Sequence, residues 1–217
     1  LEAIRTVRPR WVIIENVGGA PVESWAWDLG GDMFHRGQFA YVSTRTLDAA
    51  DWGLPSHRVR QFLVAGPKPY RWPEPTHCGP DAPVGARVRL LPWVGFGEAL
   101  GLVPGSTLLP GNGGHLPAPR CASEPAHAVT ASCPQYLRLP SPAICGAEAS
   151  GLGSSVSRKK VDQAIGRRYT CREAAILVGF PPDYPFAGGS NATFKQAGNA
   201  VAPVMAEALA RAIGASE

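Results

Sequence analysis

The sequence predicts an α/β fold in which an N-terminal part with strands and a C-terminal part with helices flank a loop-rich middle. Three observations support this prediction. The apolar run Trp11–Ile14 is typical of a buried strand. Residues 67–155 hold 15 of the 22 prolines and 12 of the 25 glycines, which excludes long helices there. Residues 167–217 contain two helix patterns with recognisable end signals.

Composition narrows the class of protein only moderately. A chain of 217 residues can bury one sizeable core, and its net charge of +4 suits a nucleic-acid binder but is equally common among other enzymes. No apolar run reaches the length of a membrane span and no signal-peptide pattern is present, so a cytoplasmic protein is expected. The five cysteines show no paired spacing, which favours reduced thiols over disulfides and predicts no metal site.

The N-terminal part predicts one helix and three strands. The run Trp11–Ile14 suits a parallel strand buried on both faces, and it ends at Glu15, at the edge of the sheet where open α/β sheets bind ligands. Residues 21–36 are amphipathic enough for a short helix. Phe39–Leu47 and Arg60–Ala65 then alternate as strands do.

The C-terminal part predicts two helices. Thr170 and Glu173 have capping-box spacing, and Gly179 is a stop signal after Val178. A second helix is expected from Pro203 to Gly214. Its apolar residues recur at helical spacing, which indicates a core-facing stripe: Val204, Met205, Ala208, Leu209, Ala212 and Ile213.

Taken alone, the candidate functional residues have ordinary explanations. A glutamate that ends a strand is most often solvated, and two arginines two residues apart, such as Arg58 and Arg60, most often lie on an exposed strand edge. Gly198-Asn199 reads as a turn. The densest basic cluster is most simply a solvated face, with phosphate contact as a second reading: Arg158, Lys159, Lys160, Arg167 and Arg168.

Four sequence blocks favour a functional role for these residues over the ordinary explanations. They are Glu15-Asn16-Val17, Leu54–Arg60, the segment from Arg168 to Glu173, and Gln196–Pro203. Together they resemble the cytosine-5 DNA methyltransferases. The resemblance implies the C-terminal part of a Rossmann-like, S-adenosylmethionine-dependent methyltransferase fold. It divides the chain into catalytic residues 1–66, a small loop-rich target-recognition region at 67–166, and a terminal part at 167–217 that returns to the catalytic domain.

The resemblance also implies roles in binding a cytosine turned out of the duplex. The block Glu15, Asn16 and Val17 would hold the base at N3 and the exocyclic amine, where a carboxyl group that shares a proton stabilises charge during attack at C6. Arg58 and Arg60 would contact the cytosine O2, the cofactor-side loop and DNA. This chain has Ser56 where the family usually has glutamine, while both arginines remain.

The terminal block would complete the cofactor site. Asn199, Ala200 and Val201 are expected beside S-adenosylmethionine, and Gly198 permits close approach of the backbone. Double-stranded DNA is the expected partner, with residues 67–155 supplying major-groove contacts and the basic cluster supplying phosphate contacts. Because Arg172 and Glu173 fall in a structural block, they are expected to brace the recognition region.

Two family blocks do not occur in this sequence. The Pro-Cys block with the nucleophile and the glycine-rich cofactor turn would both precede Glu15. We therefore expect a fragment or subunit of a DNA (cytosine-5-)-methyltransferase that is inactive alone. A truncated chain, which the initial leucine favours, a split enzyme whose N-terminal half is a separate chain, and a decayed remnant all fit. The alternatives are a catalytically silent DNA-binding or regulatory module and an unrelated proline-rich interaction protein.

Overall fold

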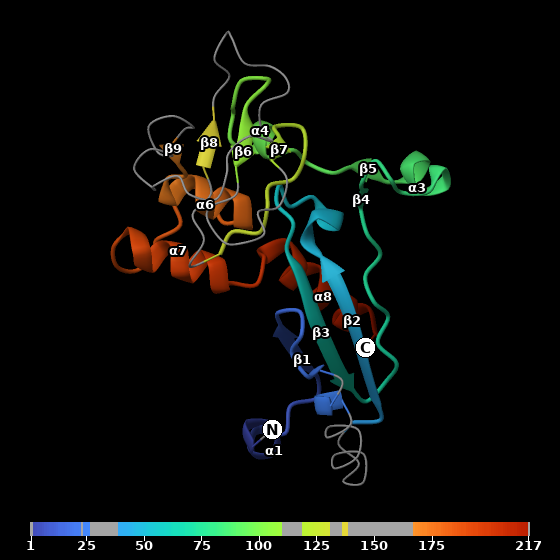
Figure 1. Cartoon of the computed structure of the whole chain (residues 1–217). Helices are drawn as coiled ribbons and strands as arrows, with labels where there is room; N and C mark the ends of the chain where they lie inside the picture. The colour runs from blue at the N-terminus through green and yellow to red at the C-terminus, as the bar shows by residue number, and fades with distance from the viewer. Residues whose placement is uncertain are drawn as a thin grey trace.

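A three-stranded sheet forms the lower half of the molecule as drawn in Figure 1. The computed structural model describes residues 2–22, 24–26, 39–109, 119–130, 136–138 and 167–216. The strands are β1 (Val12–Asn16), β2 (Tyr41–Asp48) and β3 (Val59–Gly66), in the order β1-β3-β2. The positions predicted for the second and third strands are confirmed to within two residues.

The prediction of a parallel strand buried on both faces is wrong for this sheet. β1 runs antiparallel to β3, as β2 does, and among the described residues β1 has no other neighbour. Only Val12 of this strand is buried, and Ile13 is 39% exposed. A short apolar run carries no information on strand direction, which here is set by β3 returning between its two neighbours.

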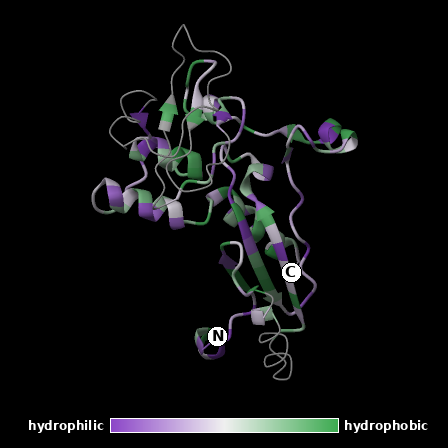
Figure 2. Ribbon diagram, in the orientation of Figure 1, coloured by the Kyte–Doolittle hydropathy of each residue, from purple (hydrophilic) through white to green (hydrophobic). Residues whose placement is uncertain are grey.

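The two faces of the sheet are covered by different parts of the chain. On one face Val12, Leu63 and Ala65 form a buried cluster with Val22 and Phe39. On the other, Leu47 and Phe62 pack against helix α8 (Pro203–Ser216), which contributes Met205 and Leu209. The strands accordingly carry much of the apolar colouring in Figure 2. Residues 22 and 24–26 are helical, while the rest of the helix predicted at 21–36 lies outside the described residues.

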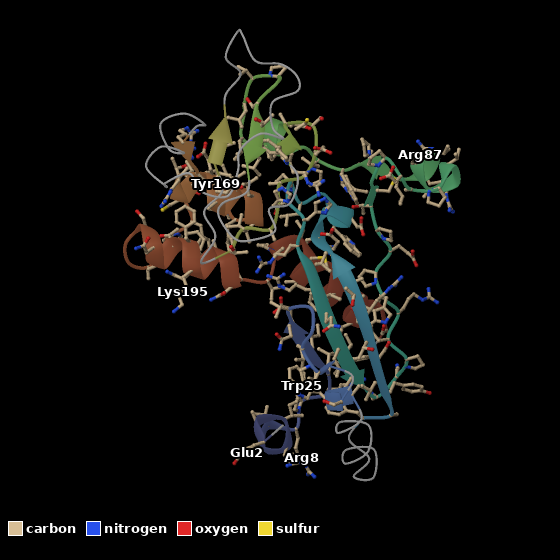
Figure 3. The ribbon with its side chains drawn as sticks, in the orientation of Figure 1. Glu2, Arg8, Trp25, Arg87, Tyr169 and Lys195 are labelled. Atoms are coloured by element: carbon tan, nitrogen blue, oxygen red, sulfur yellow. The ribbon has the colours of Figure 1, made fainter. Side chains whose placement is uncertain are left out.

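A second body, above the sheet in Figure 1, is built from short elements around its own core. Phe96, Leu108 and Leu137 pack there against Tyr169 and Leu177, and Figure 3 labels Tyr169 within this body. This agrees with the loop-rich middle expected from the prolines. Its short elements are α4 (Phe96–Ala99), β6 (Thr107–Leu109), β7 (Arg120–Cys121), β8 (Tyr136–Arg138) and β9 (Arg167–Arg168), and the four strands form a sheet in the order β7-β6-β8-β9. The elements β4 (His77–Cys78), α3 (Val84–Arg89) and β5 (Leu91–Pro92) lie to one side of it in Figure 1, and β4 pairs with β5.

Helix α6 (Cys171–Val178) forms as its end signals predict. Thr170 and Glu173 form a reciprocal capping box, and Gly179 ends the helix at φ 89°. Helix α8, however, continues past Gly214 to Ser216. Besides these, α1 (Glu2–Val7) lies at the N-terminus and the 3-10 helix η1 (Ala49–Trp52) follows β2.

Helix α7 (Ser190–Asn199) was not predicted. The interpretation of Gly198-Asn199 as a turn is wrong, because both residues belong to the last turn of α7, and Ala200–Ala202 link α7 to α8. Its side chains are mostly polar and it has no side-chain cap, so local sequence signals for this helix are weak. No helix among the described residues is long and apolar enough to cross a membrane.

Candidate active site

The carboxyl end of β1 carries an ion pair between two of the predicted residues. Glu15 lies opposite Phe62 on β3, so Arg60, two residues before Phe62, is its diagonal neighbour on the same face of the sheet. Arg60 Nε lies 2.9 Å from Glu15 Oε1, with 14% and 21% of the two side chains exposed. The sequence thus placed Glu15 correctly at a strand end, and the register brings Arg60 to it.

Arg58 directly precedes β3, two residues before Arg60, and unlike Arg60 it is fully buried. Only 2% of the residue is exposed, and its Nη2 donates hydrogen bonds to the carbonyl oxygens of Gly198 (2.9 Å) and Ala200. Burial lowers the pKa of Arg58 to about 10; the charge of Arg60 adds to this effect and that of Glu15 opposes it. Arg58 is therefore tied to the terminal turn, whereas Arg60 is tied to the glutamate.

Several polar atoms in this region are buried without a hydrogen-bond partner. They are Glu15 Oε1 and the Nε and Nη1 of Arg58. Although Glu15 Oε1 is close to Arg60, it makes no well-aligned hydrogen bond. Because buried polar groups are nearly always paired, unmatched donors and an acceptor at a sheet edge indicate a place for a polar ligand.

The remaining residues of the first block continue the strand into a turn. Asn16 pairs with Gln61 in register, and its Oδ1 accepts a hydrogen bond from the amide of Val17 (2.8 Å). Val17 is 54% exposed. Asn16 thus stabilises the exit from β1, and the backbone beyond it is open to solvent.

The residues predicted to bind the cofactor lie at the junction of α7 and α8. Asn199 ends α7 and is exposed, whereas Ala200 is half-buried. Val201 packs against the cluster that contains Leu47 and Met205. The hydrogen bonds of Arg58 to the carbonyls of Gly198 and Ala200 bring this junction next to the start of β3.

Sequence reasoning missed Asp48, which organises the segment before β3. Its Oδ1 accepts hydrogen bonds from the amides of Arg58 (2.8 Å) and Ala50 (3.2 Å), and its Oδ2 lies 2.7 Å from His57 Nδ1. An aspartate directly before a 3-10 turn is a cap signal that could have identified it. The contact with His57, nine residues on, has no local sequence signal.

The same segment joins the sheet to the second body. Ser56 is 1% exposed, and its Oγ donates a hydrogen bond of 2.6 Å to the carbonyl of Leu177 in α6. Ala126 donates to the carbonyl of Pro55 and accepts from the amide of His57, at 2.9 and 2.8 Å. Ser56, at the position where the family pattern has glutamine, is therefore a contact between the two bodies.

Of the predicted basic cluster, only Arg167 and Arg168 lie within the described residues. Arg167 makes two hydrogen bonds to Glu173 (2.6 and 2.7 Å), which raise its pKa. Glu173 also accepts from the amide of Thr170, so it braces α6 against β9. Arg158, Lys159 and Lys160 lie outside the described residues, and phosphate contact by the cluster stays a prediction.

A hollow of about 440 Å³ lies elsewhere, beneath α3. It is lined by Trp93, Arg87 and Pro125, among others, and none of the predicted site residues borders it. Figure 1 shows α3 projecting beside the β2 edge of the sheet, away from β1. No cluster of three or more potential metal ligands occurs within the part of the chain that the structure describes.

Comparison with known proteins finds relatives of this sequence and of this fold. Residues 138–215 match the family model of the C-5 cytosine-specific DNA methylases. The Type II methyltransferase M.AplI of Arthrospira platensis is 27% identical over 98% of this chain and 59% of its own length. M.NaeI of Lentzea aerocolonigenes is 28% identical over the whole chain and 52% of its own length. The chain therefore spans somewhat more than half of each relative.

Solved structures of low sequence identity support the fold. A prophage-encoded protein of E. coli described as a DNA modification methyltransferase superposes with a TM-score of 0.58 over 98% of this chain and 71% of its own, at 14% identity. The Entamoeba histolytica methyltransferase EhMeth gives 0.50 over 94% and 61%, also at 14%. These comparisons define an α/β protein with a methyltransferase-like, Rossmann-type fold. Residues 138–215 of this chain are similar to the C-5 cytosine-specific DNA methylases, and almost the whole chain is similar to Type II methyltransferases.

Proposed function

We propose that this chain supplies the base-holding residues, the target-recognition region and the last part of the cofactor site of a DNA (cytosine-5-)-methyltransferase. The observation that carries the proposal is the Glu15–Arg60 ion pair, which lies beside buried polar atoms without partners at the end of β1. Relatives named as Type II methyltransferases align over nearly the whole chain, which supports the same reaction.

The chemistry assigned to the pair follows from the electronics of cytosine. A thiolate adds to C6 only if electron density can move toward N3, so a carboxyl group that shares a proton with N3 lowers the barrier. Glu15 would hold N3 and the exocyclic amine, and Arg60 would place its positive charge at O2. Entry of the base would replace part of the Glu15–Arg60 contact with contacts to the ring.

The nucleophilic thiolate would come from polypeptide outside this sequence, which contains no Pro-Cys block. The thiolate adds to C6, C5 takes the methyl group, and loss of the C5 proton with elimination of the thiolate restores the aromatic ring. S-adenosylmethionine supplies the methyl group when bound. Turning the base out of the duplex costs a few kcal/mol of unstacking.

The terminal turn has properties that fit one side of a cofactor site. Asn199 presents an exposed amide, and the buried Gly198 beside it has no side chain to obstruct the approach of a ligand to the backbone. Asn199, Ala200 and Val201 would therefore lie at the amino-acid end of S-adenosylmethionine, where an amide can both donate and accept hydrogen bonds.

Double-stranded DNA is the proposed substrate, read by the second body. The net charge of +4 favours a polyanion, and Arg158, Lys159, Lys160, Arg167 and Arg168 would contact phosphates without specifying sequence. The enzyme would act on cytoplasmic DNA as part of a restriction–modification system, as the names of its relatives suggest.

The rest of the enzyme would join along β1. Among the described residues this strand pairs only with β3, and Ile13 is 39% exposed. An open strand edge is a template for a further strand, so the polypeptide with the nucleophile would extend the sheet here, either in the same chain or as a separate subunit.

The test begins with the coding sequence upstream of Leu1. A Pro-Cys block and a glycine-rich turn, in frame or in a neighbouring reading frame, define the partner polypeptide, and the two parts together are called the assembled enzyme below. We expect tritiated methyl transfer from S-adenosylmethionine to cytosine in DNA by the assembled enzyme and none by the chain alone. If no such polypeptide is encoded, or if the assembled enzyme transfers no methyl group, the proposal fails.

Substitutions in the pair test the assigned roles. Glu15→Gln and Arg60→Ala should each lower the turnover of the assembled enzyme by about 10²–10³-fold, because each removes one charge-stabilising contact to the ring. Glu207→Gln, an exposed carboxylate on α8 paired with Arg211, is the matched control and should leave turnover unchanged. DNA binding that survives Glu15→Gln, with no methyl transfer by any assembly, would instead indicate the silent DNA-binding module.

A further inference from the structure

We propose that Arg58 is a positioning residue that holds the turn Gly198–Ala200 in place and thereby sets the direction of the Asn199 side chain relative to the Glu15–Arg60 pair. This inference rests on the proposed function for the identity of the two ligands, but its geometry is independent of it. It gives Arg58 a role distinct from direct contact with the base.

Two hydrogen bonds bracket the segment Asn199–Ala200. Arg58 Nη2 donates to the carbonyl of Gly198 at 2.9 Å and to that of Ala200. One guanidinium thus holds the peptide groups 198–199 and 200–201, which lie at the two ends of the segment Asn199–Ala200 and restrict its movement. The side chain of Asn199 remains exposed and is presented in a defined direction.

Arg58 is itself anchored at its other end. Its amide donates to Asp48 Oδ1 at 2.8 Å, and Asp48 caps η1. The residue therefore connects the end of β2 to the junction of α7 and α8, which lies 140 residues further along the chain. Gly198 belongs to the last turn of α7, where carbonyls lack partners within the helix and attract a cation.

The contact uses one nitrogen of a buried cation. Arg58 is 2% exposed, and the described hydrogen bonds of its guanidinium run from Nη2 to two carbonyl groups, whereas Nε and Nη1 are buried without a partner. Because the guanidinium is planar and rigid, the two bonds of Nη2 also fix the direction of Nε and Nη1. The burial is consistent with a structural connection that must not move.

The contact of Arg58 with residues 198–200 also connects two proposed ligand sites. Arg58 directly precedes β3 and Arg60 is the second residue of that strand, with its Nε 2.9 Å from Glu15 Oε1. A displacement of the terminal turn would therefore be transmitted to Glu15 and Arg60 through Arg58. Binding on the cofactor side and correct placement of the base would then be coupled.

The first experiment uses the chain alone and does not depend on its function. Amide hydrogen exchange is measured for the segment 198–202 in the unsubstituted chain, in Arg58→Met and in Arg58→Lys. The matched control is Lys195→Met, which removes an exposed cation of the same helix that points away from the body in Figure 3. We expect exchange about tenfold faster in Arg58→Met, an intermediate rate in Arg58→Lys and no change in the control.

Unchanged exchange in a folded Arg58→Met would overturn the proposal. If Arg58→Met does not fold, Arg58→Lys and Arg58→Gln test the proposal instead. Each should speed amide exchange at residues 198–202 more than the control does, and a rate equal to that of the control would overturn the proposal. Loosening spread evenly over the whole chain, rather than concentrated at 198–202, would also contradict it, because that pattern indicates general destabilisation.

The second experiment uses the assembled enzyme. Arg58→Lys should raise the KM for S-adenosylmethionine about tenfold while kcat falls less, because the nucleophile and the Glu15–Arg60 pair are retained. A fall in kcat alone would mean direct contact with the base and would overturn the positioning role. An inactive unsubstituted assembly refutes the proposed function, whereas the exchange experiment still decides whether Arg58 holds the turn.

Discussion

Ser56 illustrates how one residue can depart from a family pattern and still have a defined role. A serine is too short to reach the candidate pair from its position before β3, but its hydroxyl reaches the carbonyl of Leu177 at 2.6 Å in a fully buried environment. That hydrogen bond joins the segment before β3 to α6. The substitution of serine for glutamine therefore coincides with a tight contact between the two bodies.

Replacing Ser56 by alanine should destabilise the chain by about 1–3 kcal/mol, because the buried carbonyl of Leu177 loses its hydroxyl donor. Urea denaturation followed by tryptophan fluorescence measures the change. Ser24→Ala removes an exposed hydroxyl that bonds the carbonyl of Pro21, and it should alter stability by no more than about 0.5 kcal/mol. Equal effects of the two substitutions would contradict the assigned contact.

The hydrogen bonds of Asp48 predict how the stability of the chain depends on pH. Burial acts to raise the pKa of its carboxyl group, but the hydrogen bonds from His57, Arg58 and Ala50 outweigh burial, so the pKa lies below the usual value of 3.8. A lowered pKa in the folded state favours the ionised form there. The stabilisation is therefore complete at pH values above 3.8 and is lost as the pH falls through the lower, folded-state value.

Asp48→Asn should consequently lower the free energy of unfolding most at neutral pH, and the difference from the unsubstituted chain should shrink in acid. Denaturation curves collected from pH 7 downward measure this. Glu207→Gln, on the exposed surface of α8, should show no comparable pH-dependent difference. A difference for Asp48→Asn that is constant with pH would show that the carboxylate is not stabilised by folding.

The residues of the candidate site were predictable to different degrees. Glu15 followed from the end of an apolar strand and the block around it, and Arg60 from its block. The burial of Arg58 could not be predicted, because its partners at Gly198 and Ala200 are far away in sequence. Asp48 was missed because its contacts to His57 and Arg58 depend on the path of the chain through η1.

At the scale of elements, two glycines show how the same residue type has opposite consequences. Gly179 ends α6 with φ 89°, and a Cβ there would approach Leu54 Cδ1 to 2.9 Å. Gly214 lies inside α8, where a Cβ would meet nothing within 4 Å. The first glycine is required by its conformation, whereas the second lowers the stability of a helix that continues past it.

Gly179→Ala should therefore destabilise the chain by about 1–2 kcal/mol, since an L-residue is strained at positive φ. Gly214→Ala should stabilise it by up to about 1 kcal/mol, through the higher helix propensity of alanine. Thermal and urea denaturation of the two variants measure these two changes in stability. Changes of the same sign in both variants would contradict this account of the two helix ends.

Element prediction succeeded where the signal was local. β2 and β3 follow from alternation, and α6 from its capping box and terminal glycine. Gly214 was taken as the end of α8, yet the helix runs on to Ser216, because a single glycine lowers the stability of a helix without ending it. The direction of β1 failed for a different reason, since strand pairing is a tertiary property that an apolar run does not encode.

At the scale of the whole molecule, the segment 54–57 makes three links between the sheet and the second body. Ser56 bonds Leu177, Ala126 exchanges two backbone hydrogen bonds with Pro55 and His57, and Leu54 packs closely against Gly179. All three start from residues 54–57. The segment that leads into Arg58 and Arg60 is thus also where the second body is attached, so motion of that body would reach the candidate site directly.

Because these links are buried and numerous, the two bodies should unfold together. We expect one transition when the chain alone is heated, with the same midpoint by far-ultraviolet circular dichroism and by tryptophan fluorescence, since Trp52 and Trp72 pack with the sheet-side core. The combined variant Ser56→Ala with Ala126→Pro removes one donor to Leu177 and the amide that bonds Pro55. In that variant the two midpoints should separate, with fluorescence following the sheet. Two transitions already present in the unsubstituted chain would show that segment 54–57 does not couple the unfolding of the two bodies.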